Sequence, residues 1–333
     1  MSVLRCIIMA ALLCRTASLA AAEEGALAAR RLTIAVIPKG TTHEYWESVH
    51  AGAIKAQREL ARAGRKVEIV WKGPFREDDR DQQIQVVENF MTRRVSGIVL
   101  APLDSQALVR PVLNAIRAQI PVIIIDSGLN TDQYVSFVAT DNSKGGELAG
   151  ERIVELLHGR GNVILLRYAV GSASTEQREA GFLAVLKRHP GIRLISSDQY
   201  AGPTRETAYQ ASQNLLNRFG REVNGIFTPN ETSTIGMTMA LRDIGKAGGK
   251  VKMVGFDSGT QSVNDLARGD VQGLVVQDPV AMGYQGVKLL VAHLEGKPVP
   301  KRLDTGEVMV TPENMTQPQI KALLHPPLDE YLH

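Results

Sequence analysis

Short apolar runs rich in valine and isoleucine alternate with longer segments of helical periodicity from Leu32 onward. Such runs are typical of strands buried on both faces, and their alternation with helices is typical of βαβ units. The pattern predicts nine strands, at residues 32–37, 67–71, 97–101, 121–126, 162–167, 192–196, 224–228, 251–256 and 273–277. It predicts nine helices, near residues 45–63, 79–93, 106–118, 143–157, 174–188, 205–218, 232–244, 260–268 and 280–294. Because nine strands exceed one mononucleotide-binding half, we expect an α/β protein with more than one such unit.

Polar side chains follow most of the predicted strands. Helices cover both faces of a parallel sheet, so chemistry in such a fold lies just past the carboxyl ends of the strands. The residues at these ends include Lys39, His43 and Glu44 after the first strand, Asp126 and Ser127 after the fourth, Asn230 and Glu231 after the seventh, Asp257 and Ser258 after the eighth, and Gln277 and Asp278 after the ninth. We therefore expect the candidate binding residues to gather at one edge of each sheet.

The residue types at these strand ends favour a neutral, polyhydroxylated ligand. Carboxylates such as Asp126 and Asp257 accept hydrogen bonds from hydroxyl groups, and amides such as Asn230 both donate and accept. Tyr45 and Trp46 could cover the C–H faces of a sugar ring. These two aromatic residues open a predicted helix, however, so a role as core anchors is the alternative.

Some of these polar residues have a purely structural alternative. Asp126 and Asp257 could be ordinary loop or cap residues, although a loop rather than a helix follows Asp126. Asn230 and Thr232 both precede a predicted helix. We expect Thr232 to be the N-cap, which would free Asn230 for another role.

No catalytic motif is present in the sequence. It contains no G-x-S-x-G elbow, no P-loop and no H-E-x-x-H, and the first strand-to-helix turn lacks G-x-G-x-x-G. A hydrolase would have to be assembled from Asp126, Asp257 and His43 without a local signature, which leaves that activity as a remote alternative. No second histidine lies at metal-ligand spacing from His43. We therefore expect no enzymatic activity, no cofactor and no metal.

The amino terminus has the organisation of a secretory signal peptide. Arg5 is followed by an apolar run at residues 6–14 and then by small residues, which predicts a signal peptide over residues 1–22. A membrane anchor is the alternative, but the run is too short to span a bilayer and Arg15 ends it. Lipidation of Cys14 is disfavoured because no small residue precedes it.

Composition and charge bear on the cellular compartment of the protein and on whether it binds nucleic acid. The 333 residues include 44% hydrophobic and 22% charged side chains, which is typical of a folded chain. The net charge of +3 comes without a basic block, so nucleic acid is not an expected partner. Both cysteines lie in the predicted leader. The mature chain therefore has no disulfide, which fits export into a bacterial envelope compartment.

Several ordered strings in this chain resemble one protein family over about residues 32–310. They are TIAVI with Tyr45-Trp46, GIVLAPLDSQAL, IPVIIIDS, VATDNSKGGELAG, the G-S-A-S-x-x-x-R-x-x-G-F form at residues 171–182, GIFTPNETSTIGMTMAL, VGFD and VVQDPVAMGYQGV. In order and spacing they are similar to the periplasmic sugar-binding proteins of ABC importers, the group of ribose-binding protein. This group shares its fold with the ligand domains of lactose-repressor-type regulators.

The resemblance implies the type I periplasmic binding protein fold, in which two Rossmann-like lobes with parallel sheets are joined by three crossovers. On this reading the lobes are built from residues 32–139 plus 278–305 and residues 140–277 plus 306–324, and residues 325–333 form a tail. The crossovers would lie near residues 139–141, 277–278 and 305–306.

The resemblance also implies a function and a set of binding residues. The chain would be a monomeric periplasmic protein that captures a sugar or polyol between its lobes and delivers it to the membrane subunits of an ABC permease. The binding residues carried over by motif are His43, Tyr45, Trp46 and Asp126 in the first lobe, and Arg178, Asn230, Asp257 and Gln277 in the second lobe and hinge.

Departures from the family pattern limit the choice of ligand. Ribose-binding proteins have Asn in place of His43, Arg in place of Ser127, and Phe in the region of residues 200–203. D-Ribose is therefore disfavoured, and another pentose, a hexose, a polyol or a sugar derivative remains open. Lys39 and Glu44 beside the site leave a charged ligand open as well.

A second function class shares the same binding site. A sensory receptor would present its closed form to a membrane kinase or chemoreceptor, and the binding residues do not distinguish it from a transport receptor. A transcription regulator would need an N-terminal helix-turn-helix, and this chain carries the predicted export signal there.

Overall fold

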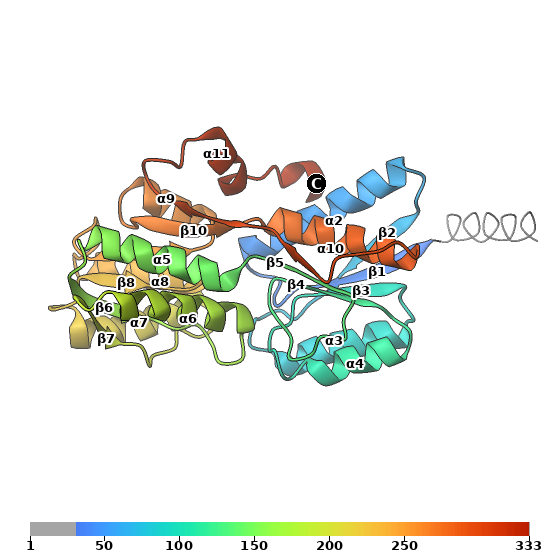
Figure 1. Cartoon of the computed structure of the whole chain (residues 1–333), viewed down its shortest axis with the longest axis horizontal. Coiled ribbons are helices and arrows are strands. Elements are labelled where there is room, and N and C mark those ends of the chain that lie inside the picture. The colour runs from blue at the N-terminus through green and yellow to red at the C-terminus, as the bar shows by residue number, and fades with distance from the viewer. Residues whose placement is uncertain (1–30, 333) are drawn as a thin grey trace, which may run out of the picture.

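The computed structural model describes residues 31–332, which form two lobes, each built around a six-stranded sheet (Figure 1). The first sheet has the order β11-β5-β4-β3-β1-β2 and the second the order β12-β10-β9-β8-β6-β7. The strands of the first sheet are β1 (Leu32–Ile37), β2 (Val67–Trp71), β3 (Gly97–Leu100), β4 (Val122–Ile125), β5 (Ser136–Ala139) and β11 (Arg302–Asp304). Those of the second are β6 (Gly161–Leu165), β7 (Ile192–Ser196), β8 (Gly225–Phe227), β9 (Lys252–Phe256), β10 (Gly273–Gln277) and β12 (Glu307–Val310). All neighbouring strands are parallel except β10 and β12.

Helices cover both faces of each sheet (Figure 1). In the first lobe, α2 (Glu44–Arg62) and α10 (Pro279–Leu294) pack on one face, and α3 (Arg80–Thr92) and α4 (Val109–Arg117) pack on the other. In the second lobe, α5 (Asn142–Leu156) and α6 (Ala173–Arg188) cover one face. The opposite face is covered by α7 (Arg205–Phe219), α8 (Glu231–Asp243), α9 (Thr260–Ala267) and α11 (Pro318–Leu324). The short helix α12 (Asp329–Leu332) lies against α2.

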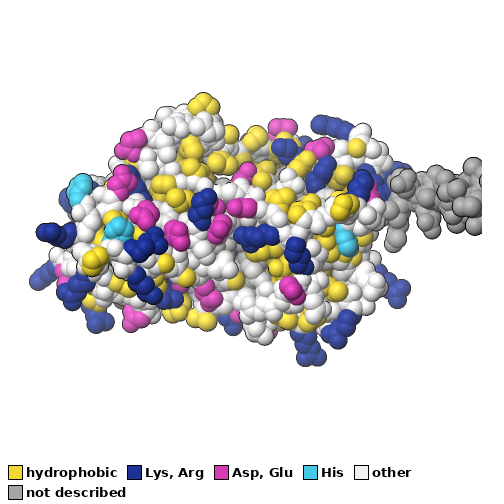
Figure 2. All heavy atoms as spheres, viewed as in Figure 1, with side chains coloured by type: hydrophobic (Ala, Val, Ile, Leu, Met, Phe, Trp, Pro, Cys, Tyr) yellow, Lys and Arg dark blue, Asp and Glu magenta, His cyan; other side chains and the backbone are white. Residues whose placement is uncertain are grey.

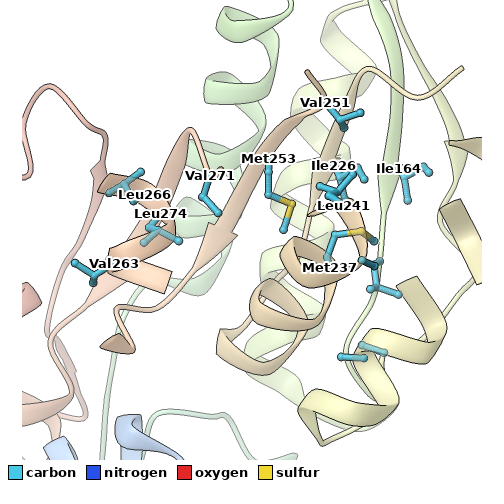
Figure 3. Close-up of a cluster of buried hydrophobic side chains, with 14 of the residues drawn as sticks. Ile164, Ile226, Met237, Leu241, Val251, Met253, Val263, Leu266, Val271 and Leu274 are labelled. Carbon is cyan, nitrogen blue, oxygen red and sulfur yellow. The ribbon is translucent and has the colours of Figure 1, made fainter. Parts of the chain in front are cut away.

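The apolar runs of the sequence are the cores of these lobes. Residues from β6, β8, β9 and β10 are fully buried against α8 and α9, as the labelled side chains of Figure 3 show. Burial of these apolar side chains away from water is the main stabilising contribution to each lobe. The burial also leaves the strand ends as the places where polar side chains can meet a ligand.

The predicted fold class is confirmed, and so are all nine predicted strands and nine predicted helices, with ends within three residues of those expected. The sequence pattern missed β5, β11, β12, α11 and α12, all of which are short. The predicted signal peptide over residues 1–22 lies outside the described residues.

The chain passes between the two sheets three times. It leaves the first sheet after β5, returns after β10, and passes back between β11 and β12. The returning helix α10 packs closely on α2, because a Cβ atom on Gly52 would lie 2.0 Å from the carbonyl oxygen of Val280 and one on Gly283 would lie 2.0 Å from that of Val49. This contact fixes the distant segment to the first lobe.

Acidic and basic side chains are interspersed over the face shown in Figure 2, including the region where the lobes meet. Among the helices of residues 31–332, none is both long and apolar enough to span a bilayer.

Candidate functional site

A narrow cavity lies between the two lobes, at the carboxyl ends of their strands. All eight residues predicted to bind ligand line it: His43, Tyr45, Trp46, Asp126, Arg178, Asn230, Asp257 and Gln277. The other lining residues are Lys39, Glu77, Tyr168, Ser172, Ser174, Thr175 and Glu231. The structure therefore brings together residues from both lobes that are far apart in the sequence.

Asp126 and Asp257 occupy equivalent positions in the two lobes. Asp126 directly follows β4 and Asp257 directly follows β9, and each of these strands is third in the order of its sheet. The backbone N–H of Asp126 donates to Val138 at 3.0 Å, and that of Asp257 donates to Val275 at 2.9 Å. Both residues have a positive φ, 62° and 72°, which is unfavourable for a non-glycine residue and concentrates at functional sites. This turn directs each carboxylate into the cavity.

The two carboxylates have different partners. Asp126 forms an ion pair with Lys39 at 2.9 Å and accepts a hydrogen bond from the Tyr45 hydroxyl at 2.9 Å. Asp257 accepts hydrogen bonds from the Gln277 side chain at 2.7 Å and from the backbone N–H of Glu231 at 3.0 Å. Burial raises the pKa of the Asp257 carboxyl, with the charge of Arg178 and the bond from Gln277 opposing that rise. Asp257 thus also satisfies one of the free N–H groups at the start of α8, so the cap alternative holds in part.

A buried glutamate organises one wall of the cavity. Glu77 accepts hydrogen bonds from His43 Nδ1 at 2.8 Å, Trp46 Nε1 at 2.6 Å and the Tyr168 hydroxyl at 2.6 Å. Burial by itself would raise the pKa of Glu77, but the bond from His43, the charges of His43 and Lys39, and the bond from Tyr168 together lower it to about 2. Burial lowers the pKa of His43, and the bond and charge of Glu77 outweigh this, so that it is raised above 6.5. The contact between the two side chains therefore favours the charged form of each.

Arg178 is held in place by contacts on three sides. Its Nε donates to the Asn142 side chain at 2.8 Å, its Nη1 donates to the carbonyl of Pro229 at 2.9 Å, and its guanidinium lies 3.8 Å from the centroid of the Phe256 ring. Close approach of α5 and α6 makes this possible, because a Cβ atom on Gly146 would lie 1.9 Å from the carbonyl oxygen of Arg178. The remaining guanidinium nitrogen is available for a ligand oxygen.

The expected cap of α8 is wrong. Asn230, not Thr232, is the N-cap, and its side chain accepts from the backbone N–H of Ser233 at 3.3 Å. Its amide nitrogen donates to the Thr232 hydroxyl at 3.0 Å. Asn230 lines the cavity but is not free of a structural role, because α8 begins one residue earlier than the sequence pattern indicated.

Contacts across the cavity hold the lobes together. Ser174, at the start of α6, accepts from Lys39 Nζ at 3.1 Å, and its backbone N–H donates to the Ser127 hydroxyl at 3.1 Å. Tyr168 reaches Glu77 from the opposite lobe. Tyr200, in the region where the family places Phe, is 44% exposed and does not line the cavity. The structure is therefore the closed arrangement, with Tyr168 as the aromatic residue contributed by the second lobe.

Three residues that line the cavity but that the sequence did not assign to ligand binding, Tyr168, Glu231 and Glu77, differ in how they could have been found. Tyr168 lies just past β6, so the rule applied to the other strand ends would have included it. Glu231 directly follows Asn230 as the first residue of α8, so the strand-end rule finds its position but not its place in the cavity wall. Glu77 lies several residues beyond the end of β2, where no pattern marks it.

Comparison with known proteins agrees with this geometry. Residues 34–298 match the family described as "Periplasmic binding protein domain". The D-allose-binding periplasmic protein of Escherichia coli is 30% identical over 275 residues, which cover 80% of this chain and 86% of that protein.

Two solved structures are similar over nearly all of the described chain. One is a carbohydrate transporter solute binding protein from Agrobacterium radiobacter in complex with D-arabinose, with 35% identity, a TM-score of 0.83, and coverage of 89% of this chain and 100% of that one. The other is an ABC transporter solute binding protein from Agrobacterium vitis with bound D-fucose, with 34% identity, a TM-score of 0.83, and coverage of 88% and 100%. With the closed two-lobed fold and the family match over residues 34–298, this chain belongs to the periplasmic binding protein family.

Proposed function

We propose that this chain is a receptor that captures a sugar or sugar-like polyol between its lobes and delivers it, unchanged, to the membrane subunits of an ABC permease. The observation that carries the proposal is the pair Asp126 and Asp257, which face one cavity from equivalent strand ends of opposite lobes. Two such carboxylates accept hydrogen bonds from hydroxyl groups on two sides of one ligand. The sugars bound by the similar proteins support this ligand class.

The charges around the cavity favour a neutral ligand over a charged one. Lys39 pairs with Asp126, His43 pairs with Glu77, and Arg205 pairs with Glu231 at 3.1 Å. Glu44 accepts from both the backbone N–H and the hydroxyl of Thr260, each at 2.8 Å. The two residues that left a charged ligand open, Lys39 and Glu44, thus already have partners of their own.

The same proposal covers the setting in which the protein works. We propose that the chain is exported to the periplasm, that residues 1–22 are removed, and that the mature protein acts as a monomer. The family match and the absence of cysteine after residue 22 support export. D-Ribose stays disfavoured, because the Ser127 hydroxyl accepts a hydrogen bond from the backbone of Ser174 and this position offers no arginine guanidinium to the ligand.

A thermal-shift screen tests the proposed ligand class. The panel contains D-arabinose, D-fucose, D-allose and D-galactose, with D-glucuronate as a charged sugar. A ligand at 100 times its Kd stabilises the native state by about 2.7 kcal/mol, so the best neutral sugar should raise Tm by roughly 5 to 10 °C. A shift with D-glucuronate alone would contradict the neutral-ligand proposal. Recovery of a chemically altered sugar from the complex would contradict the proposed lack of turnover.

Ligand should also compact the protein by favouring the closed arrangement. Only in this arrangement do Asp126 and Asp257 reach one ligand, so the ligand binds the closed state more tightly and shifts the population toward it. Small-angle scattering should show a smaller radius of gyration at saturating sugar. An unchanged radius of gyration would contradict closure on binding.

Tryptophan fluorescence gives the same closure a local readout. Trp46 lines the cavity and donates to Glu77, whereas Trp71 stacks on His50 with ring centroids 4.4 Å apart and does not line it. Trp46→Phe should therefore remove most of the fluorescence change on binding, and Trp71→Phe is the matched control that should keep it.

A further inference from the structure

A second cavity adjoins the first and shares two residues with it. Its walls include Glu44 and Ser48 of α2 and Ser258 to Thr260 at the start of α9. Leu324 to Leu328 of the C-terminal segment close one side. Tyr45 and Glu231 line both cavities, so they form the boundary between the ligand site and this additional space.

Glu231 has a buried carboxylate oxygen that no protein group satisfies. Its Oε1 accepts from Arg205 at 3.1 Å, whereas its Oε2 has no hydrogen-bond partner among residues 31–332. The side chain is only 3% exposed. A buried acceptor without a donor is costly, and carboxylates form the stronger, charge-assisted class of hydrogen bond. The oxygen is therefore suited to a donor that arrives with a ligand.

A glycine keeps this carboxylate at the boundary between the cavities. A Cβ atom on Gly259 would lie 2.8 to 3.1 Å from the three carboxyl atoms of Glu231. Gly259 has a φ of −55°, which any residue adopts, so glycine is not needed here for its backbone conformation. It is needed because it has no side chain. The missing side chain leaves room for the Glu231 carboxylate.

The charged groups that face Glu231 come from three other segments. His43 and Glu44 lie at the start of α2, Arg205 lies at the start of α7, and Asp257 follows β9. Burial raises the pKa of Glu231 to about 7, with repulsion from Asp257 and Glu44 adding to the rise and the charges of His43 and Arg205 opposing it. A hydrogen bond donated by a ligand would lower this pKa, because it stabilises the charged form.

We propose that Glu231 is a specificity-determining residue of the sugar site, and that its Oε2 accepts a hydrogen bond from a ligand hydroxyl directed toward the second cavity. This inference rests on the proposed function. It implies that the site selects sugars with a hydroxyl at this edge over the corresponding deoxy sugars, and that the second cavity gives that end of the ligand room to extend.

Calorimetric titration of Glu231→Gln with D-arabinose, D-fucose, D-allose and D-galactose tests the proposal. The variant should bind the best of these sugars about tenfold more weakly than the wild type. Gly259→Ala displaces the carboxylate without removing it and should weaken binding in the same direction. Glu206→Gln is the matched control, because Glu206 is exposed in the first turn of α7, next to Arg205. This variant should bind the sugars with unchanged affinity.

Proton release provides a readout that a purely structural role would not change. Wild-type protein should release protons on binding sugar near pH 7, measured by titration in two buffers with different ionisation enthalpies, and its affinity should rise from pH 6 to pH 8. Glu231→Gln should lose this release. A monodeoxy analogue that lacks the contacting hydroxyl cannot form this hydrogen bond with either protein. Glu231→Gln should therefore bind the analogue with the same affinity as the wild type.

The outcomes separate this inference from the proposed function. If the wild type binds a sugar and Glu231→Gln binds it within twofold, or if proton release persists in the variant, the inference is overturned and the proposed function stands. Proton uptake in place of release would mean that Glu231 donates, which also overturns it. If no neutral sugar binds the folded wild type, both fail.

Discussion

Replacing Asp126 or Asp257 with Ala should weaken sugar binding by about 2 to 4 kcal/mol, or roughly 30-fold to 1000-fold. Each carboxylate is buried at the wall of the closed cavity, so ligand hydroxyls that lose it are left without an acceptor and away from water. Titration calorimetry with the best sugar of the panel measures the effect. Affinity retained in both variants would assign the two residues a structural role only.

The choice of variant matters because both positions have a positive φ. Alanine adds backbone strain there, whereas Asn tolerates the conformation and removes only the charge. Asp126→Asn also leaves the Lys39 ammonium without its carboxylate, so thermal unfolding should be measured alongside binding. Asp132→Asn, at an exposed position, is the matched control and should change neither quantity.

Glu77→Gln should lower the free energy of unfolding by about 3 kcal/mol near pH 5.5. The fall of the Glu77 pKa from 4.5 to about 2 reports how strongly the folded state favours the charged carboxylate. A difference of this size corresponds to about 3 kcal/mol, and breaking a buried ion pair costs a similar amount. Urea unfolding measures the loss. Glu88→Gln, an exposed glutamate on α3, is the control and should cost less than about 0.5 kcal/mol.

The pH dependence distinguishes this ion pair from simple packing. Because the folded-state pKa of Glu77 lies below 4.5, its stabilisation is fully present above pH 4.5 and is lost as the pH falls toward 2. The raised pKa of His43 has the opposite consequence. The stabilisation that His43 contributes is present below pH 6.5 and is lost as the pH rises through the folded-state pKa. The difference between wild type and Glu77→Gln should therefore be largest between pH 4.5 and 6.5. A constant difference from pH 2 to pH 8 would contradict the assignment.

Burial accounts for two of the three strands that the sequence pattern missed, β11 and β12, but not for β5, which is fully buried. Strands such as Ile98 to Leu100 of β3 are buried on both faces, so they appear as uninterrupted apolar runs. The edge strands β11 and β12 are mostly exposed or half-buried and contain three and four residues. They are strands because they form backbone hydrogen bonds with β5 and β10. This pairing leaves no signal in the local sequence of hydrophobic and polar residues.

The sequence by itself determined which side chains reach the strand ends, since a continuous apolar run fixes both the strand and the residue that follows it. That is why Asp126, Asp257 and Gln277 could be placed at strand ends without coordinates, whereas the family resemblance supplied His43 and Tyr45 as binding residues. The position of Glu77 could not, because its loop has no period and its partners come from two lobes.

Only the tertiary structure decided the electrical character of the site. Lys39 and Glu44 looked like candidates for a charged ligand because their partners, Asp126 and Thr260, are distant in the sequence. Folding brings Lys39 to 2.9 Å from Asp126 in a buried cavity, where an unpaired charge would be costly, and it brings the Glu44 carboxylate to 2.8 Å from the backbone N–H and the hydroxyl of Thr260. The sequence thus determined the inventory of polar groups, and the packing of the two lobes determined which of them are left for a ligand, because Coulomb and hydrogen-bond energies depend on distance in space and not along the chain.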